Sequence, residues 1–248
     1  MNSMASYLLQ GRYDERPWGV RDLRPWFDHQ PDVPIGEVWF NEDSAPLMKF
    51  IFTRERLSIQ VHPDDNYAAR RHGGRGKTEA WCVVAAEPGA CLGLGFRRTL
   101  SREEATKAAL DGSIDELLDW REVAPGELYF VPAGTVHAIG PGLVLFEVQQ
   151  VSDLTYRLYD YGRPRELHLE DGFAVANLGP YTVRNDAKRV ECPYFRLERR
   201  TVRAGERIEA LADRDLFIVG PGGKIRRLPQ GDAPYRVEDS GEILLASV

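Results

Sequence analysis

Side chains that bind metals recur at alternate positions in the strand-like segments of this chain. Successive residues of a strand point to opposite faces, so Gln60 and His62 face the same way, as do Lys77 and Glu79. A further histidine, His137, follows a Pro and a Gly that turn the chain after a predicted strand. A fold that gathers these groups into one site must bring short strands together from distant parts of the sequence.

Short runs of β-branched and aromatic residues, separated by turn residues, predict a mainly β protein. The predicted strands are residues 37–40, 47–53, 57–61, 80–85, 128–131, 144–150 and 155–159. This close spacing is typical of an antiparallel sandwich or barrel. From position 190 to the end, short strands return between Gly-rich turns.

Helices are expected at three places. A Ser-x-x-Glu capping box at Ser101 predicts a helix that ends near Leu110, and a second box at Ser113 predicts a helix over residues 115–120. Apolar residues at helical spacing predict another over residues 167–178. The proline-rich, aromatic segment 12–28 is expected to pack as an irregular arm across the barrel.

Composition limits the possible partners. The net charge of −6 argues against nucleic acid or an anionic membrane as a general partner. No stretch approaches the roughly 18 apolar residues needed to span a bilayer. The three cysteines, Cys82, Cys91 and Cys192, lack CxxC spacing, and no N-terminal apolar run of signal length precedes them. We therefore expect a cytoplasmic protein.

The ligand types suit a divalent metal. The imidazoles of His62 and His137, the Glu79 carboxylate and the Gln60 amide oxygen are compatible with Zn²⁺, and by ligand type also with Mn, Fe or Co. One carboxylate leaves positive charge at the metal, which can polarise hydroxyl or carbonyl oxygens of a sugar. Any one of these residues alone is more often structural, and their combined spacing is what favours a site.

Glu147 and Arg157 allow two interpretations. Alternation along their strands places Glu147 with Gln149 on one face, and Arg157 with Thr155 and Tyr159 on another. Both charged side chains then either face the barrel interior or form a cross-strand ion pair on the outer surface, where such a pair contributes little.

Residues 126–137 match the pattern G-x5-P-x-G-x2-H, the second signature of the cupin superfamily, and Gln60, His62 and Glu79 stand where the first signature lies. The resemblance implies a mainly β jelly-roll (cupin) barrel with short helical insertions and a second, smaller, degenerate cupin-like β domain. Residues 1–165 would form the catalytic cupin domain, with its helical insertion at about 101–120. Residues 166–189 would form a helical bridge, and residues 190–248 a small β domain without metal ligands.

Longer segments resemble the type I mannose-6-phosphate isomerase family in its short bacterial form. The similar segments are residues 35–39, 57–65, 76–79, 132–138 and 147–161. The similarity covers Arg12 to about Leu178, and the tail after Val190 matches only as a shortened second cupin domain.

The resemblance implies a zinc-dependent aldose–ketose isomerase of carbohydrate metabolism that interconverts mannose 6-phosphate and fructose 6-phosphate, with one Zn²⁺ per chain. The family's metal ligands match Gln60, His62, Glu79 and His137, and its substrate-pocket residues match Lys49, Lys77, Glu147, Asp153 and Arg157. Some members carry a histidine immediately before the lysine of the Lys-x-Glu element, and here that position is Gly76. The expected partner is a small hexose phosphate, and the expected state is a monomer or weak homodimer.

Isomerisation removes a proton from the carbon next to a carbonyl and returns it to the neighbouring carbon through a cis-enediol. Arg157 is assigned to stabilise negative charge in the enediolate, and Glu147 or Asp153, or a metal-bound water, to move the protons, with Lys77 and Lys49 as further cations. Two alternatives stay open: a metal-binding cupin of other chemistry, such as an oxygenase, and a non-catalytic sugar-binding or structural cupin.

Overall fold

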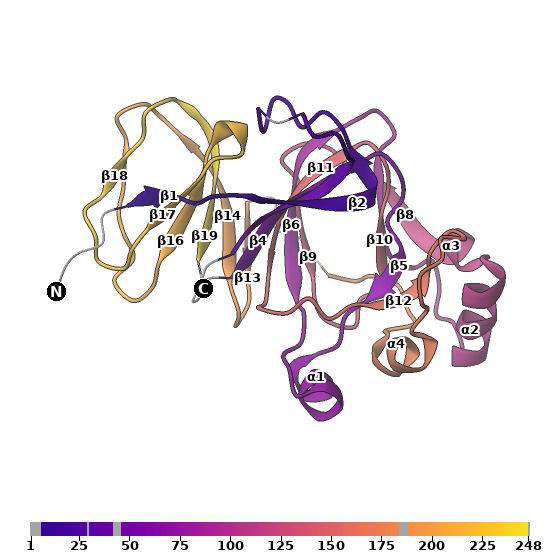
Figure 1. Cartoon of the computed structure of the whole chain (residues 1–248). Coiled ribbons are helices and arrows are strands. Elements are labelled where there is room, and N and C mark those ends of the chain that lie inside the picture. Colours follow the sequence, from indigo (N-terminus) through magenta and orange to yellow (C-terminus); the bar gives the residue numbers. More distant parts are fainter. Residues whose placement is uncertain (1–5, 29, 42–45, 184–187, 248) are drawn as a thin grey trace.

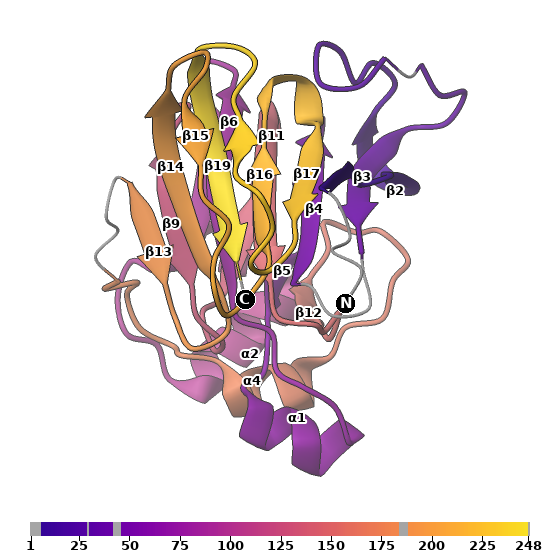
Figure 2. The same ribbon diagram turned by 90° about the vertical axis from the view of Figure 1, so that its left-hand side faces the viewer.

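The computed structural model describes residues 6–28, 30–41, 46–183 and 188–247. Figure 1 shows two β units side by side, with the C-terminal strands in one unit and the strands of the central part of the chain in the other. Helices α1 and α4 lie below the larger unit in both views (Figures 1 and 2), and α2 lies at its right-hand end in Figure 1. The prediction of a mainly β protein with short helical insertions is confirmed.

The larger unit is a barrel of two antiparallel sheets. In the described residues, the first sheet has the strand order β2 (Arg12–Val20), β3 (Ile35–Phe40), β4 (Leu47–Thr53), β11 (Leu143–Gln149), β6 (Glu79–Ala86), β9 (Leu128–Val131). The second sheet has the order β12 (Tyr156–Tyr159), β5 (Ile59–Val61), β10 (His137–Ile139), β7 (Cys91–Phe96), β8 (Leu118–Glu122). Strands distant in sequence, such as β5 and β10, are therefore neighbours.

Apolar side chains from the two sheets meet inside the barrel. Ile51, Val83 and Leu145 come from the first sheet and Leu92 and Leu94 from the second, and all five are at most 1% exposed and belong to one cluster. Burying such side chains stabilises the fold by roughly 1.5–3 kcal/mol each. This shared core holds the two sheets face to face.

Strand β2 corrects the expectation of an irregular arm over residues 12–28. Residues Arg12 to Asp14 pair regularly with β3, the register shifts between Asp14 and Glu15, and it breaks again between Glu15 and Val20. Pro17, which has no amide hydrogen to donate, falls within this break, and β2 lies at the sheet edge. An edge strand with an interruption therefore accommodates a proline that a central strand would not.

Two of the three predicted helices form near the expected positions. Helix α2 (Arg102–Asp111) begins after Ser101, whose hydroxyl accepts a hydrogen bond from the Glu104 amide at 3.1 Å. Helix α4 (Leu169–Val175) lies within the predicted range. None of the helices in the described part of the chain has the length and apolar character needed to cross a lipid bilayer.

The helix expected over residues 115–120 is wrong in its extent. Helix α3 (Ile114–Leu117) has only four residues, and the chain continues directly into β8. Ser113 makes no cap, because its hydroxyl donates instead to Asp111 at 2.6 Å. Pairing of β8 with β7 outweighs the local helical pattern.

Helix α1 (Asp65–His72) was not predicted. Asp64 caps it by accepting a hydrogen bond from the Tyr67 amide at 2.7 Å, and Gly73 ends it in the left-handed conformation with φ 67°. The Lys77 amide then donates to the Pro63 carbonyl at 3.0 Å. The segment between His62 and Glu79 is thus a loop that contains α1, and its end at Lys77 is hydrogen-bonded to its start at Pro63.

The smaller unit has a sheet whose described strands follow the order β1 (Tyr7–Leu8), β17 (Ile225–Leu228), β16 (Leu216–Val219), β19 (Gly241–Ser247), β14 (Arg196–Val202), β13 (Arg189–Glu191). A short turn, η1 (Pro221–Gly223), joins β16 to β17, and β15 (Arg207–Ile208) pairs with β18 (Tyr235–Arg236). Residues 7–8 therefore belong to the C-terminal sheet, although the predicted bounds assign them to the first domain.

Both units contribute to one apolar cluster. It contains Phe50 and Phe146 from the barrel and Leu197, Phe217 and Ala246 from the C-terminal sheet, each at most 1% exposed. The predicted boundaries at 165 and 190 stay a prediction, and residues 184–187 of the proposed bridge lie outside the described residues. The cluster ties the C-terminal sheet to the outer face of the barrel.

Candidate active site

Two histidines and a glutamate converge inside the barrel. His62 follows β5, Glu79 begins β6 and His137 begins β10. Their ligand atoms all lie within 4.8 Å of one another, and the three residues are at most 2% exposed. Glu79 Oε2 lies 3.5 Å from His62 Nε2, and Glu79 Oε1 lies 3.3 Å from His137 Nε2. The barrel therefore gathers three of the four predicted metal ligands around one point.

Backbone carbonyls determine the tautomers of both rings. His62 Nδ1 lies 3.0 Å from the Leu154 carbonyl, and His137 Nδ1 lies 2.9 Å from the Thr135 carbonyl. Since a carbonyl only accepts, both Nδ1 atoms carry hydrogen, and the Nε2 lone pairs point to the common centre. Burial and the nearby Lys77 ammonium lower the pKa of His62 to about 3, and burial lowers the pKa of His137. Both rings are thus neutral, as metal ligands must be.

Glu79 supplies the anionic ligand. Burial alone would raise its pKa, but Lys77 and the two imidazoles hold the pKa well below its usual value. Its Oε1 atom is buried without a hydrogen-bond partner among the described residues. A buried carboxylate oxygen with an open lone pair, beside two imidazole nitrogens, fits a divalent ion such as Zn²⁺.

The fourth predicted ligand, Gln60, lies beside this centre. It pairs with His137 across β5 and β10, and its Nε2 lies 3.1 Å from His137 Nε2. Its Oε1 accepts a hydrogen bond from the Ser58 hydroxyl at 3.3 Å. A half-turn of the amide would exchange the two atoms and present the oxygen to the centre.

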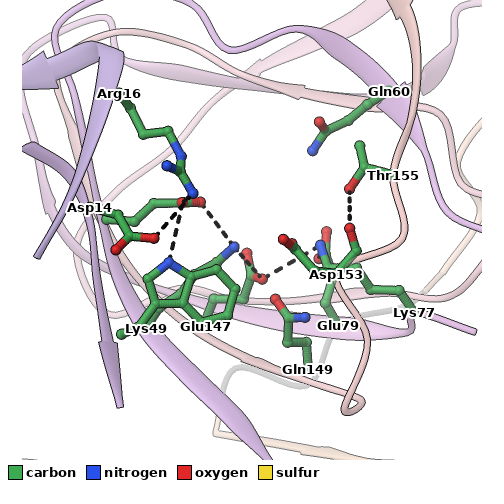
Figure 3. Close-up of polar contacts among 12 residues, drawn as sticks. Asp14, Arg16, Lys49, Gln60, Lys77, Glu79, Glu147, Gln149, Asp153 and Thr155 are labelled. Carbon is green, nitrogen blue, oxygen red and sulfur yellow. Dashed lines mark hydrogen bonds and ion pairs between the residues drawn. The ribbon is translucent and has the colours of Figure 1, made fainter. Parts of the chain in front are cut away.

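A chain of alternating charges leads away from the three ligands (Figure 3). Lys77 Nζ contacts the Glu79 carboxylate, lies 3.0 Å from His62 Nε2 and lies 3.7 Å from Glu147 Oε1. Glu147 Oε1 in turn lies 3.3 Å from Lys49 Nζ. Of the two interpretations of Glu147, the structure supports the interior one, since Glu147 is 2% exposed and faces Lys49 across β11 and β4.

The surroundings of Glu147 change its acidity. Burial and repulsion by Glu79 raise the pKa of Glu147 to about 7, against the opposing attraction of Lys49 and Lys77. The Trp81 indole nitrogen donates to Glu147 Oε2 at 2.9 Å and holds the carboxyl group in place. Burial would lower the pKa of Lys49, but Glu147 and other nearby carboxylates raise it above its usual value. Glu147 can therefore accept or release a proton near neutral pH.

The charge chain continues through residues that the sequence analysis did not select. Glu37 Oε1 lies 3.1 Å from Lys49 Nζ, and Glu37 Oε2 lies 2.6 Å from the Arg16 guanidinium. Trp39 donates to Glu37 at 3.3 Å and packs its ring 4.3 Å from Lys49 Nζ. The sequence did contain a signal for these residues. Glu37 and Trp39 are two positions apart on one strand, so they face the same side, and they lie in segment 35–39, which resembles the family.

Arg157 lies opposite Gln60 in the pairing of β12 with β5. Its Nη1 donates to the Glu166 carbonyl at 2.7 Å, and its Nε is buried without a hydrogen bond to any described residue. Three arginines surround the buried carboxylate of Asp160: Arg157, Arg163 and Arg165. Glu55 also lies 3.9 Å from Arg163, so two carboxylates face three guanidinium groups at this edge of the barrel.

Asp153 occupies a different environment from the other predicted site residues. It lies in the segment between β11 and β12 and is exposed to solvent, and its backbone carbonyl accepts a hydrogen bond from the Thr155 hydroxyl at 3.4 Å. In Figure 3 the dashed line at Asp153 leads to Thr155. The buried lysines and carboxylates are therefore brought together, and Asp153 lies at their margin.

An antiparallel β barrel with a buried His–Glu–His cluster defines the metal-binding cupin class. No family model matches the chain. The mannose-6-phosphate isomerase of Streptococcus mutans is 42% identical over 215 residues, which cover 69% of this chain and 68% of the relative. The mannose-6-phosphate isomerase ManA of Bacillus subtilis is 39% identical over 172 residues, which cover 62% of this chain and 54% of the relative. The chain belongs to the mannose-6-phosphate isomerase family.

Solved structures share the fold. The crystal structure of the Bacillus subtilis mannose 6-phosphate isomerase matches with a TM-score of 0.84 at 22% identity, covering 99% of this chain and 100% of that chain. A zinc-bound mannose 6-phosphate isomerase matches with a TM-score of 0.71 at 14% identity, covering 98% of this chain and 99% of that chain. These matches confirm the predicted cupin fold.

Proposed function

We propose that this chain is a metal-dependent aldose–ketose isomerase that interconverts mannose 6-phosphate and fructose 6-phosphate. Membership of the family supports the reaction and the substrate. The observation that carries the proposal is a buried metal-type cluster beside a carboxyl group, Glu147, whose pKa lies near neutrality. Proton transfer next to a carbonyl needs both an electrophile at the oxygens and a base of this strength.

Zinc, one ion per chain, is the proposed cofactor. His62, Glu79 and His137 would hold it, with Gln60 as the fourth ligand after its amide turns. When bound, the ion would supply a Lewis acid that polarises the oxygens on the two reacting carbons. Two neutral imidazoles and one carboxylate are a donor set common to catalytic zinc sites.

Glu147 is the proposed proton carrier. In the forward direction it takes the proton from C2 of the open-chain aldose, leaving a cis-enediol, and returns it to C1, while the hydroxyl proton moves from O2 to O1. Its burial supports this assignment over Asp153, because Glu147 is 2% exposed inside the barrel whereas Asp153 is exposed to solvent.

The lysines and arginines of the site interact with different negatively charged groups. Lys77 and Lys49 flank Glu147 and keep its carboxyl group oriented toward the centre. Arg157 stabilises negative charge on the enediolate oxygens, and the excess positive charge that it forms with Arg163 and Arg165 attracts the 6-phosphate. The cytoplasmic location and the monomeric or weakly dimeric state remain predictions.

A coupled assay of mannose 6-phosphate conversion tests the proposal. We expect turnover that a chelator abolishes and added Zn²⁺ restores, with about one equivalent of metal per chain by elemental analysis. Metal-loaded protein that isomerises no hexose phosphate would contradict the proposal and favour a cupin of other chemistry. Protein with neither metal nor turnover would favour a non-catalytic sugar-binding cupin.

A further inference from the structure

Gln149 is a buried polar residue that the proposed reaction does not use. It is 0% exposed and lies at the end of β11, two residues after Glu147 and on the same face. In the sheet it pairs with Glu79 of β6. Figure 3 shows its side chain between those of Glu147 and Glu79, at the floor of the site.

Two carbonyl groups determine how the Gln149 amide is turned. Its Nε2 donates to the Ser152 carbonyl and lies 3.4 Å from the Gln150 carbonyl. Since carbonyl oxygens only accept, the NH₂ group must face them, and the amide oxygen must face the other way. The side chain is therefore held in one orientation, with its donor used and its acceptor directed at the site.

The Gln149 oxygen has no donor of its own. Oε1 is buried and makes no hydrogen bond to any residue in the described ranges. The Lys77 ammonium group already contacts His62, Glu79 and Glu147. A buried acceptor without a partner is costly and rare in folded proteins, so it points to a donor that arrives with a ligand.

We propose that Gln149 Oε1 accepts a hydrogen bond from one sugar hydroxyl beyond the two reacting carbons. The identity of the ligand rests on the proposed function. The position of Gln149 between Glu147, the proposed proton carrier, and Glu79, a proposed metal ligand, places this acceptor next to the reacting carbons. A site built around such a contact rejects an otherwise identical ligand that lacks the hydroxyl, because the acceptor then stays buried and unpaired. Gln149 thus selects polyhydroxylated sugar phosphates over their deoxy analogues.

Binding of a non-reacting ligand tests the inference without requiring turnover. Mannitol 6-phosphate has the open chain and the phosphate but no carbonyl. It is titrated calorimetrically, with its 3-, 4- and 5-deoxy analogues, into zinc-loaded wild type and Gln149→Met, which keeps the side-chain length and removes the acceptor. We expect the variant to bind the parent compound roughly 10- to 100-fold more weakly. One deoxy analogue should bind wild type equally weakly and lose nothing further in the variant.

A matched control separates the acceptor from the loop that Gln149 also tethers. Ser152→Ala removes the hydrogen bond from the Ser152 hydroxyl to the Arg75 carbonyl at 2.8 Å and loosens the same segment. It should keep the wild-type ratio between the parent compound and each deoxy analogue. Metal content and melting temperature of all three proteins confirm that they are folded and loaded.

The outcomes of these titrations that would overturn the inference are distinct. If Gln149→Met binds the parent as tightly as wild type, or loses the same factor for the parent and for all three analogues, the inference fails while the proposed function stands. A loss of discrimination in Ser152→Ala equal to that in Gln149→Met assigns the effect to the loop and also overturns it. A wild type that binds no hexitol phosphate overturns the inference together with the proposed function.

Discussion

At the residue scale, the site places charges of opposite sign next to one another inside a barrel. Burying a charge is expensive unless it is paired, and here each lysine lies between carboxylates. Glu147, in contrast, is buried near the anionic Glu79, and burial and this repulsion outweigh the attraction of Lys49 and Lys77 and raise its pKa to about 7. The same arrangement that raises the pKa of Lys49 thus prepares one carboxyl group for proton transfer.

The His137→Ala variant should lose metal and activity together. Removing one imidazole leaves two protein ligands from the described cluster, and a site with two ligands does not retain Zn²⁺ against a mild chelator. Elemental analysis after dialysis and the coupled assay measure both effects. A variant with full metal content would exclude His137 as a ligand.

The Glu147→Gln variant should keep its metal and lose turnover by about 10²–10⁴-fold, the usual contribution of a general acid–base group. The amide keeps the shape and can still accept from the Trp81 indole, but it cannot take up the proton. Steady-state kinetics on the zinc-loaded protein give the comparison, with Asp153→Asn as the control. A larger loss in the Asp153 variant would transfer the role to Asp153.

The Arg157→Ala variant should also keep its metal while losing turnover. The guanidinium group lies opposite Gln60 but makes no contact with the three clustered ligands in the described structure. We expect a fall in kcat/KM of roughly 10²-fold or more, as for other groups that stabilise developing negative charge. Retention of full activity would show that Arg157 serves only the ion pairs with Asp160.

At the element scale, the loop between His62 and Glu79 requires the backbone at Gly76 to lie close to the backbone at the start of α1. A Cβ at Gly76 would lie 2.5 Å from the Asp64 carbonyl carbon and 2.6 Å from the Asp65 nitrogen, both backbone atoms at the start of α1. Gly76 also donates its amide hydrogen to the Asp65 carboxylate at 2.8 Å. The histidine that some family members carry at this position therefore does not fit this loop without moving α1.

Gly76→Ala should destabilise the protein and weaken metal binding. The methyl group forces α1 away from the segment that leads to Lys77 and Glu79, at a cost of about 1–3 kcal/mol in the free energy of unfolding. Gly74→Ala is the matched control, because a Cβ there meets nothing within 4 Å. Urea denaturation of both variants measures the difference, and equal stability would mean that α1 shifts freely.

At the scale of the whole molecule, the smaller unit is held to the barrel by a common core. Phe217 of the C-terminal sheet and Phe146 of the barrel are both fully buried in the same cluster. Strand β1 connects the units a second time, since it precedes β2 of the barrel and pairs with β17 of the smaller sheet. We therefore expect the two units to unfold together.

The Phe217→Ala variant should destabilise the barrel although Phe217 lies outside it. Removing a buried phenylalanine costs roughly 3–5 kcal/mol, and a shared core transmits this loss to the site. Thermal inactivation and circular dichroism should show one transition at a lower temperature, with Leu110→Ala, at a position 69% exposed, as the control. Two separate transitions, with the barrel unchanged, would indicate independent units.

The sequence by itself determined the residue types of the site and the strands that carry them. Alternation along extended chain placed Gln60 with His62 and Lys77 with Glu79, although His62 lies just after β5 and Lys77 just before β6. The pattern around Ser101 likewise located α2 through a cap that forms within one helical turn. These features depend on neighbours a few residues away, so the sequence carries them directly.

Only the tertiary structure decided which distant groups meet. The pairing of Glu147 with Lys49, the carbonyl of Leu154 that orients His62, and the strand β8 in place of a longer helix all depend on cross-strand register. The register of paired strands is set by packing over the whole barrel, so a short segment of sequence does not predict it. For the same reason the acidity of Glu147 and the unpaired oxygen of Gln149 arise from the fold rather than from the sequence around them.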